Sequence, residues 1–162
     1  MPGAAGARAG GGMASQQMLF EDIFEVLDKD PDGRKFDKVS RVVCRSDLYE
    51  MDLKLDVNVD IYPLEVGDKF SLAMNSSLAT DGTADTGTFS PDKFKQGGSL
   101  MDIYEYVMHG KIFKFQEVEA SQGLKVNVFI SFGGLLMLLS GDPKKLEDLQ
   151  LDSSVYLLVR KV

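Results

Sequence analysis

Three aspartates at alternate positions, followed by a glycine, form the segment with the clearest potential for chemistry. Asp28, Asp30, Asp32 and Gly33 match the start of an EF-hand calcium loop. Such a loop needs a bidentate glutamate at its twelfth position and a helix on either side. The twelfth position here is Val39, and the flanking segments have the composition of strands. We therefore predict that the cluster is a hairpin turn and not a calcium site.

The chain has few other residues of the types that bind metals or act in catalysis. His109 and Cys44 are the only histidine and the only cysteine, whereas a zinc site uses three or four ligands. A catalytic histidine needs a nucleophile and an orienting carboxylate, and no motif supplies them. We predict a structural or interface role for His109 and a small buried side chain, in a reducing compartment, for Cys44. We expect no metal, no cofactor, no small-molecule substrate and no active site.

The charge and hydropathy of the chain narrow the classes of partner. The 162 residues include 25 acidic and 18 basic side chains, for a formal net charge of −7. Binding to phosphate backbones depends on a basic face, so contact with nucleic acid is expected to be indirect at most. No apolar run approaches the ~20 residues that span a bilayer. We therefore predict a soluble intracellular protein that does not associate with a membrane.

The chain is predicted to fold as one domain of residues 18–162. Residues 1–17 are mostly Gly and Ala and cannot bury enough apolar surface to order themselves, which predicts a disordered tail. The stretch 76–100 is rich in Ser, Thr, Gly, Asp and Lys and shows no hydrophobic period. This composition predicts a mobile loop between two strands of the domain.

The clearest structural pattern is the strict alternation of apolar and polar residues from Met51 to Ile61. A period of two indicates a strand with one face in a core and the other in water. At ~3.3 Å per residue such a strand is unusually long and has to curl, which favours a small barrel. About eight apolar segments, separated by turn residues and without a long amphipathic helix, predict an all-β antiparallel barrel or sandwich.

Two segments in the second half of the chain lead to more specific expectations. Gly110 interrupts an apolar stretch and is predicted to mark a bulge or bend, whereas Glu117 to Leu124 has the composition of a generic connection. Phe132 to Leu139 contains a double glycine followed by five apolar residues. One interpretation of this segment is a strand buried on both faces, with the glycines at a barrel corner. The other is a strand whose outward residues, Leu136 and Leu138 or their neighbours, meet a partner, and the two are compatible.

Several segments, taken in order, resemble one protein family. They are Leu19–Phe24, Asp30–Asp37, Leu55–Asn58, Ile61–Pro63, Gly67–Phe70, Tyr104–Lys111, Ser131–Met137 and Tyr156–Leu158. From Met18 onward the chain is similar to the common small subunit, the eighth, that nuclear RNA polymerases I, II and III share, with plant-like details. The string from Gly133 to Met137 is the most specific part of the resemblance.

The resemblance implies an OB-fold-like antiparallel barrel of about eight strands and a non-catalytic subunit in the nucleus. Such a subunit docks on the largest polymerase subunit and on neighbouring core subunits, and it supports assembly and transcription. The expected partner-binding residues are Ser131, Phe132, Gly133, Gly134, Leu135, Leu136 and Met137. The family's mobile loop maps onto residues 80–98. We expect the partner to contact apolar side chains and an exposed strand edge along Phe132 to Leu138.

An alternative hypothesis is a free OB-type module that binds single-stranded nucleic acid through stacked aromatic side chains. The residues available for this role are Tyr104, Tyr106, Phe113 and Phe115 for stacking, with Lys111 and Lys114 for charge. The net acidity argues against this function, and the same aromatic residues serve equally well in a core. The non-catalytic polymerase subunit is therefore the leading hypothesis.

Overall fold

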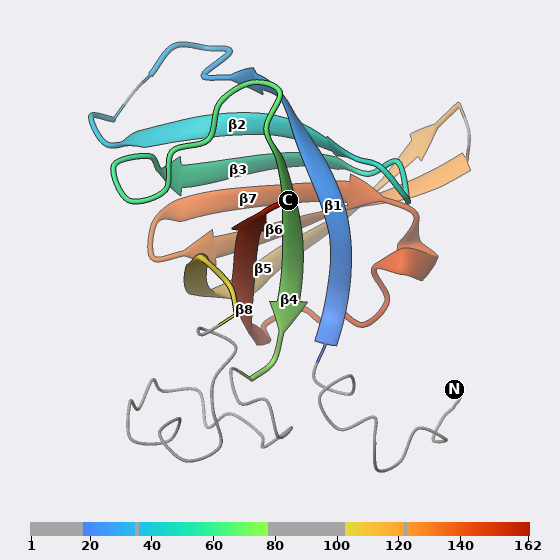
Figure 1. Ribbon diagram of the computed structural model, residues 1–162. Helices are drawn as coiled ribbons and strands as arrows, with labels where there is room; N and C mark the ends of the chain where they lie inside the picture. The colour runs from blue at the N-terminus through green and yellow to red at the C-terminus, as the bar shows by residue number, and fades with distance from the viewer. Residues whose placement is uncertain (1–17, 35, 78–102, 122) are drawn as a thin grey trace.

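Eight strands and one short 3-10 helix make up the described part of the protein (Figure 1). The computed structural model describes residues 18–34, 36–77, 103–121 and 123–162. The elements are β1 (Met18–Lys29), β2 (Val39–Ser46), β3 (Asp52–Asn58), β4 (Lys69–Asn75), β5 (Tyr106–Ala120), β6 (Gly123–Phe132), β7 (Leu135–Gly141), the 3-10 helix η3 (Pro143–Lys145) and β8 (Ser154–Lys161). The predicted tail at residues 1–17 lies outside the described residues, as does the predicted loop from residue 78 onward.

The strands close into a barrel in the order β1-β2-β3-β7-β6-β5-β8-β4. Every neighbouring pair is antiparallel, and β1 pairs with both β2 and β4, which joins the two ends of the sheet. Closure pairs backbone groups that an open sheet would leave exposed at its edges. The all-β class and the number of strands are confirmed, and the structure selects the barrel over the sandwich.

The inward side chains of the strands fill the barrel with a single apolar core. Alternate residues along each strand point inward, as Leu53, Leu55 and Val57 of β3 do, and these side chains are buried. Within the same core Phe24 and Phe70 stack with their ring centroids 6.1 Å apart. The removal of this apolar surface from water is the main favourable contribution to folding. It also explains the period of two in the sequence, because in most strands only one face is buried; β4 and β8 also bury Ala73, Tyr156 and Leu158 on their outer face.

The strand predicted from Met51 to Ile61 ends earlier than expected. β3 stops at Asn58, and the residues after it form turns. The Asn58 side chain accepts a hydrogen bond from the backbone N–H of Asp60 at 3.1 Å, and its carbonyl accepts one from Tyr62 at 2.9 Å. A side-chain bond of this kind competes with the strand ladder. The alternation therefore continues past the end of the strand, and Ile61 is exposed.

The bulge predicted at Gly110 is also wrong, because Gly110 lies in the regular ladder between β5 and β8. The register with β6 shifts instead between Ile112 and Lys114. A Cβ atom at Gly110 would lie 2.5 Å from the ring of Phe132 and 2.3 Å from the carbonyl oxygen of Ser131. The glycine is thus explained by the close approach of β6, which leaves no space for a side chain.

The segment from Glu117 to Leu124 is not the generic connection that its composition predicts. It is the far end of a hairpin in which β5 and β6 stay paired as far as Ala120 and Gly123. The ladder between β5 and β8 stops at Lys111. The last part of the hairpin therefore projects beyond the barrel (Figure 1).

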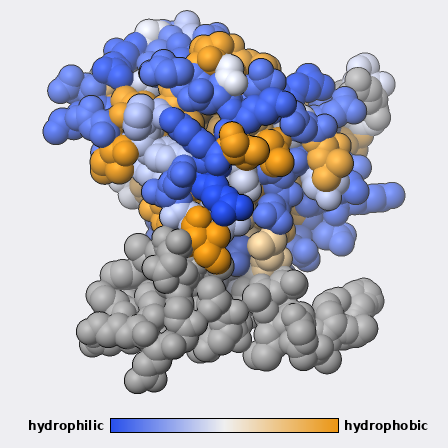
Figure 2. Space-filling model, viewed as in Figure 1, coloured by the Kyte–Doolittle hydropathy of each residue, from blue (hydrophilic) through white to orange (hydrophobic). Residues whose placement is uncertain are grey.

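The described surface is mainly hydrophilic on the side that β1 and β4 face. Figure 2 shows hydrophobic residues there as separate patches among polar ones, without a continuous apolar surface. No helix in the described ranges is long and apolar enough to cross a membrane. Candidate interaction surfaces are therefore sought over the other strands.

Candidate partner-binding site

The residues predicted to bind a partner come together in the hairpin between β6 and β7. In chain order they are Ser131 and Phe132 at the end of β6, Gly133 and Gly134 in the turn, and Leu135, Leu136 and Met137 at the start of β7. Phe132, Leu135 and Met137 point into the barrel and pack in its core. Leu136 points outward and is 42% exposed. The hairpin thus offers a partner one apolar side chain together with its turn.

The double glycine has a local explanation that involves no partner. Phe132 and Leu135 pair across a two-residue turn, and both Gly133 and Gly134 have positive φ angles, of 65° and 104°. Two-residue hairpin turns of type I′ need positive φ at both central positions, which glycine adopts without steric cost. The glycines therefore set the direction of the chain at this turn.

The apolar run that follows is buried on one face only, so the alternative of a strand buried on both faces is wrong. Leu135, Met137 and Leu139 belong to the core, whereas Leu136 and Leu138 face out of the barrel. The strand is not, however, a free edge. β7 pairs with β6 along its whole length and with β3 from Met137 to Ser140. The exposed edge expected along Phe132 to Leu138 is therefore wrong for Met137 and Leu138, which β3 covers, whereas Leu135 and Leu136 have no partner on that side among the described strands.

A shallow groove of about 200 Å³ lies beside the outward leucines. It is lined by Arg41 of β2, Lys54 of β3, Phe113 of β5, Phe129 of β6, and Leu136, Met137 and Leu138 of β7. Phe113 and Phe129 lie with their ring centroids 6.2 Å apart, and Lys114 lies over the Phe129 ring at 5.2 Å. The groove therefore joins apolar side chains to a basic rim, in a protein that is acidic overall. We refer to it below as the Leu136 groove.

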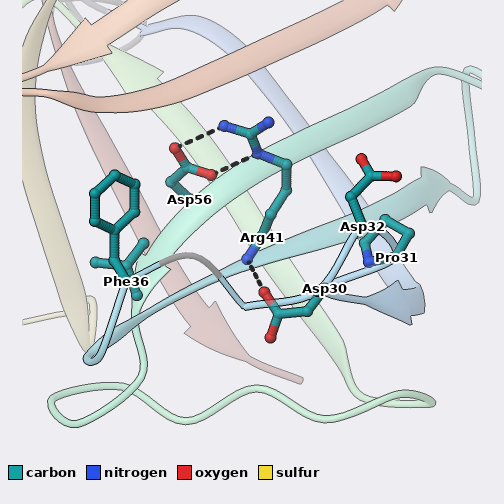
Figure 3. A pocket seen from close by; sticks show the side chains of 8 residues that line it. Asp30, Pro31, Asp32, Phe36, Arg41 and Asp56 are labelled. Carbon is teal, nitrogen blue, oxygen red and sulfur yellow. Dashed lines mark hydrogen bonds and ion pairs between the residues drawn. The ribbon is translucent and has the colours of Figure 1, made fainter.

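A buried carboxylate fixes the backbone of Leu136 beside this groove. Asp56 of β3 accepts a hydrogen bond from the Leu136 N–H at 3.0 Å. The same carboxylate binds the Arg41 guanidinium through two hydrogen bonds, of 2.7 and 3.1 Å (Figure 3). These bonds raise the pKa of Arg41, since the paired carboxylate favours its charged form. Asp56 thus connects β2, β3 and β7 where β3 and β7 no longer share a ladder.

The aspartate cluster at the start of the chain lies in a turn beside this ion pair. Figure 3 shows Asp30 accepting a hydrogen bond from the backbone N–H of Arg41, at 3.0 Å. The Asp30 carbonyl accepts a further bond from Gly33, and Asp28 bonds to the adjacent N–H of Lys29. The Asp28 and Asp30 carboxylates therefore accept hydrogen bonds from backbone N–H groups, as expected in the predicted hairpin turn. Among the described residues no three acidic, His or Cys side chains are grouped as a metal site.

The lone cysteine and the lone histidine have ordinary surroundings. Cys44 is buried in the core, and burial raises the pKa of its thiol to about 12, so it stays protonated and unreactive at neutral pH. This confirms the prediction of a small buried side chain. His109 is exposed on β5 and lies against Tyr156, with 4.5 Å between ring centroids. That contact agrees with a structural role.

The aromatic residues of the alternative hypothesis do not share one face. Tyr106 is buried in the core, stacked on Tyr62 at 5.2 Å, while Tyr104 packs on a separate buried cluster. Phe113 lines the Leu136 groove. Phe115 pairs with Val128, which points inward, so its side chain lies on the opposite side of the sheet from Phe129. The structure therefore supplies no continuous platform on which successive bases could stack.

Several residues of the groove were not predicted from the sequence. Lys54 and Asp56 occupy polar positions of the clearest alternating strand, which identifies their outward direction but no role. Arg41 belongs to a strand far from Leu136 in the sequence, and Phe129 is opposite Leu138 in the hairpin between β6 and β7. Only the order of strands in the barrel brings these side chains together, so no local signal could have identified them.

Comparison with known proteins identifies a matching family and close relatives. The family model described as RNA polymerase Rpb8 matches residues 21–161. Subunit 8B of DNA-directed RNA polymerases II, IV and V from Arabidopsis thaliana is 53% identical over 150 residues, which cover 93% of this chain and 100% of the relative. A subunit of RNA polymerases I, II and III from Dictyostelium discoideum is 52% identical over 89% of this chain and 97% of its own length. The corresponding Saccharomyces cerevisiae subunit is 38% identical over 88% of this chain and 97% of its own length.

Proposed function

The chain belongs to the RNA polymerase Rpb8 family, and we propose that it is a shared structural subunit of nuclear DNA-directed RNA polymerases. As a member of this family it is a non-catalytic subunit and not the subunit that carries the active site. The observation that carries the proposal is the match over residues 21–161, which spans all eight strands of the barrel from the fourth residue of β1 onward.

The Leu136 groove is the surface that we propose for docking on another subunit. Its volume of about 200 Å³ is below the roughly 300–1,000 Å³ of typical small-molecule pockets. It is open and apolar, and it suits one or two anchor side chains of a protein partner, which are the contacts that dominate many interfaces. The basic rim formed by Lys54 and Lys114 favours a partner surface with acidic residues around its apolar anchor.

We propose that this partner is the largest polymerase subunit and that the complex resides in the nucleus. The resemblance to the family, which implies partner-binding residues from Ser131 to Met137, supports this assignment. The relatives differ in the polymerases that their names include, with II, IV and V for the Arabidopsis protein and I, II and III for the Dictyostelium protein. The set of polymerases that contain this chain is therefore the first property to measure.

Affinity purification of the tagged full chain from nuclear extract tests the proposed function directly. We expect the largest subunits of several polymerase classes to co-purify in moderate salt and to be identified by mass spectrometry. Recovery of one class alone would indicate a specialised subunit. Recovery of the chain without any large subunit would overturn the proposal.

Substitution of Leu136 tests the docking surface. Leu136→Asp places a charge in the apolar groove and is expected to reduce recovery of the largest subunit at least roughly tenfold, because burying an unpaired charge at an interface is costly. Leu136→Gln repeats the test without adding charge beside Asp56. The matched control is Leu151→Asp, since Leu151 is 52% exposed and lies in a turn outside the groove. Normal recovery with both Leu136 variants, provided that they fold, would exclude the groove as the docking surface.

A further inference from the structure

The longest strand edge that no described strand covers belongs to β5. β5 pairs with β8 only from Tyr106 to Lys111, and Ile112 still bonds to the connection before β8. From Phe113 to Ala120 its one partner among the described strands is β6. Closure of the barrel removes most other edges, so this free edge, here called the β5 edge, is an exception that calls for a physical explanation.

The directions of the backbone groups along the β5 edge follow from the hairpin. Ala120 and Gly123 close the two-residue connection, and such a closing pair exchanges hydrogen bonds across the ladder. The backbone groups of Ala120, Val118, Gln116 and Lys114 therefore form hydrogen bonds with β6. The N–H and C=O groups of Phe115, Glu117 and Glu119 point the other way, to the free side.

The hydrogen bonds of Ile112, at the other end of the free edge, indicate the same alternation of backbone directions. Its N–H donates to the Ser153 carbonyl at 3.0 Å, and its carbonyl accepts from Asp152 at 2.8 Å, so both groups of Ile112 point away from β6. The register shift between Ile112 and Lys114 inserts one residue and reverses the alternation. The backbone N–H and C=O groups of Lys114 therefore point to β6, and those of Phe115 point to the free side. The alternation derived from the turn gives the same directions.

The side chains along the edge define what a neighbouring strand would meet. Phe115, Glu117 and Glu119 are exposed and lie on one face of the hairpin, because residues two apart share a face. On β6, Glu117 and Glu119 are opposite Val126 and Leu124, and neither glutamate forms an ion pair with another described residue. The edge thus presents two carboxylates and one aromatic ring at alternate positions.

This pattern disfavours pairing between two copies of the chain. An antiparallel pair of β5 edges centred on Glu117 would place carboxylates directly opposite one another, and like charges in cross-strand pairs are destabilising. A strand with basic side chains at the same positions would gain favourable cross-strand pairs instead. The net charge of −7 adds long-range attraction for a basic segment.

We propose that the β5 edge binds an extended basic segment of another polymerase subunit, which adds to the sheet as a further strand. The segment carries basic residues opposite Glu117 and Glu119 and an apolar residue opposite Phe115, which is a basic–x–basic–x–apolar pattern in one chain direction or the other. Backbone hydrogen bonds to the outward groups of β5 hold it, as in other cases of strand addition. This surface is separate from the Leu136 groove, and the inference rests on the proposed function only for the source of the segment.

Amide hydrogen exchange resolved by residue tests the proposal on the full chain, free and within purified polymerase. In the free chain the amides of Phe115, Glu117 and Glu119 should exchange quickly, while those of Gln116 and Val118 are protected by β6. Assembly should slow exchange of the first three by roughly tenfold or more, because they acquire hydrogen bonds. Protection of these three amides already in the free chain would overturn the proposal, and so would fast exchange at all three in the complex.

Two variants test the edge without altering the intramolecular ladder. Glu117→Pro removes an N–H that points to the free side, and proline is tolerated at such edge positions. We expect it to fold with an unchanged thermal midpoint and to co-purify with less polymerase. The double variant Glu117→Lys/Glu119→Lys should reduce recovery roughly three- to tenfold, since two favourable cross-strand pairs become repulsive. The matched control, Glu147→Lys/Asp148→Lys, makes the same change of net charge at exposed residues after η3.

The outcomes separate this inference from the proposed function. Normal recovery of polymerase with Glu117→Pro and with the double lysine variant would overturn strand addition and leave the subunit assignment intact. An equal loss with the Glu147→Lys/Asp148→Lys control would show that net charge alone matters, and it would also overturn the inference. Failure of the wild-type chain to recover any polymerase subunit would instead overturn the proposed function and, with it, the source of the segment.

Discussion

The strand β6 takes part in two hairpins, and these hairpins differ in how their edges are covered. At its C-terminal end it turns through Gly133 and Gly134 into β7, which β3 covers on the other side. At its N-terminal end it follows β5 through residues 121 and 122, in a part of the sheet that projects beyond the barrel. Both connections have two residues. The difference therefore lies in the neighbouring strands and not in the turns.

The comparison shows that one strand can contribute to a stable core at one end and to an interaction surface at the other. Val128 and Ile130 of β6 are fully buried, whereas Leu124 of the same strand is 49% exposed and Val118 opposite that end is 38% exposed. Apolar burial stabilises the first region. The second region leaves backbone groups and side chains available to a partner.

The largest difference is expected between alanine substitutions in the two regions. Ile130→Ala leaves a cavity in the barrel core and should lower the free energy of unfolding by about 3 kcal/mol. Val118→Ala, at the projecting end, should lower it by less than about 0.5 kcal/mol. Urea denaturation of both purified variants measures the two values. Similar losses would mean that the projecting hairpin is as well packed as the barrel.

Gly110→Ala should be nearly as damaging, because β6 approaches β5 too closely for a side chain at this position. The added methyl group would contact the ring of Phe132 and the carbonyl of Ser131, and such overpacking should cost about 2–3 kcal/mol of stability. Adding Phe132→Leu removes the ring contact but not the carbonyl contact, so it should restore only part of the loss. Full stability of Gly110→Ala in thermal unfolding would contradict the close packing of this hairpin.

The ionisation of Cys44 tests whether the barrel interior disfavours a charged side chain. Burial raises its pKa from 9.0 to about 12, so the unfolded chain loses the proton first as the pH rises. Stability is then fully present below pH 9 and decreases by about 1.4 kcal/mol per pH unit between pH 9 and 12. Cys44→Ala removes this contribution, and the gap between the two unfolding curves should change with pH by that amount. Parallel curves from pH 8 to 11 would show that the thiol is accessible to water.

The smallest effect is expected from the bond that fixes the first residues of β7. Asp56→Ala removes the acceptor for the Leu136 N–H and for Arg41, and should lower the free energy of unfolding by about 1–2 kcal/mol. Asp56→Asn keeps an oxygen for one of these donors and should cost less. Amide exchange at Leu136 should accelerate in the alanine variant. Unchanged exchange there would mean that the turn is held by its glycines alone.

The fold was predictable from the sequence in its elements but not in all of their limits. The alternation through Leu53, Leu55 and Val57 identified β3 and its inward face, yet the strand ends at Asn58 because that side chain forms a turn. The sequence leaves open whether Leu136 and Leu138 face out of the barrel, and the structure places them there. The composition of Glu117 to Leu124 did not predict a strand, because few apolar residues are needed where a hairpin leaves the core.

Four features of this protein can be read from its residues alone: the all-β class, the resemblance to the polymerase subunit, the position of the Gly133-Gly134 turn and the absence of a complete EF-hand loop. These features depend on local patterns, because the period of two and the conformational freedom of glycine act within a few residues. Other features emerge from the folded barrel: which strand edges are covered, the hydrogen bond between Asp56 and the Leu136 N–H, and the position of Arg41 and Phe129 beside the same groove. Those contacts depend on register and on closure of the barrel, which join residues far apart in the chain and leave no signal in a single segment.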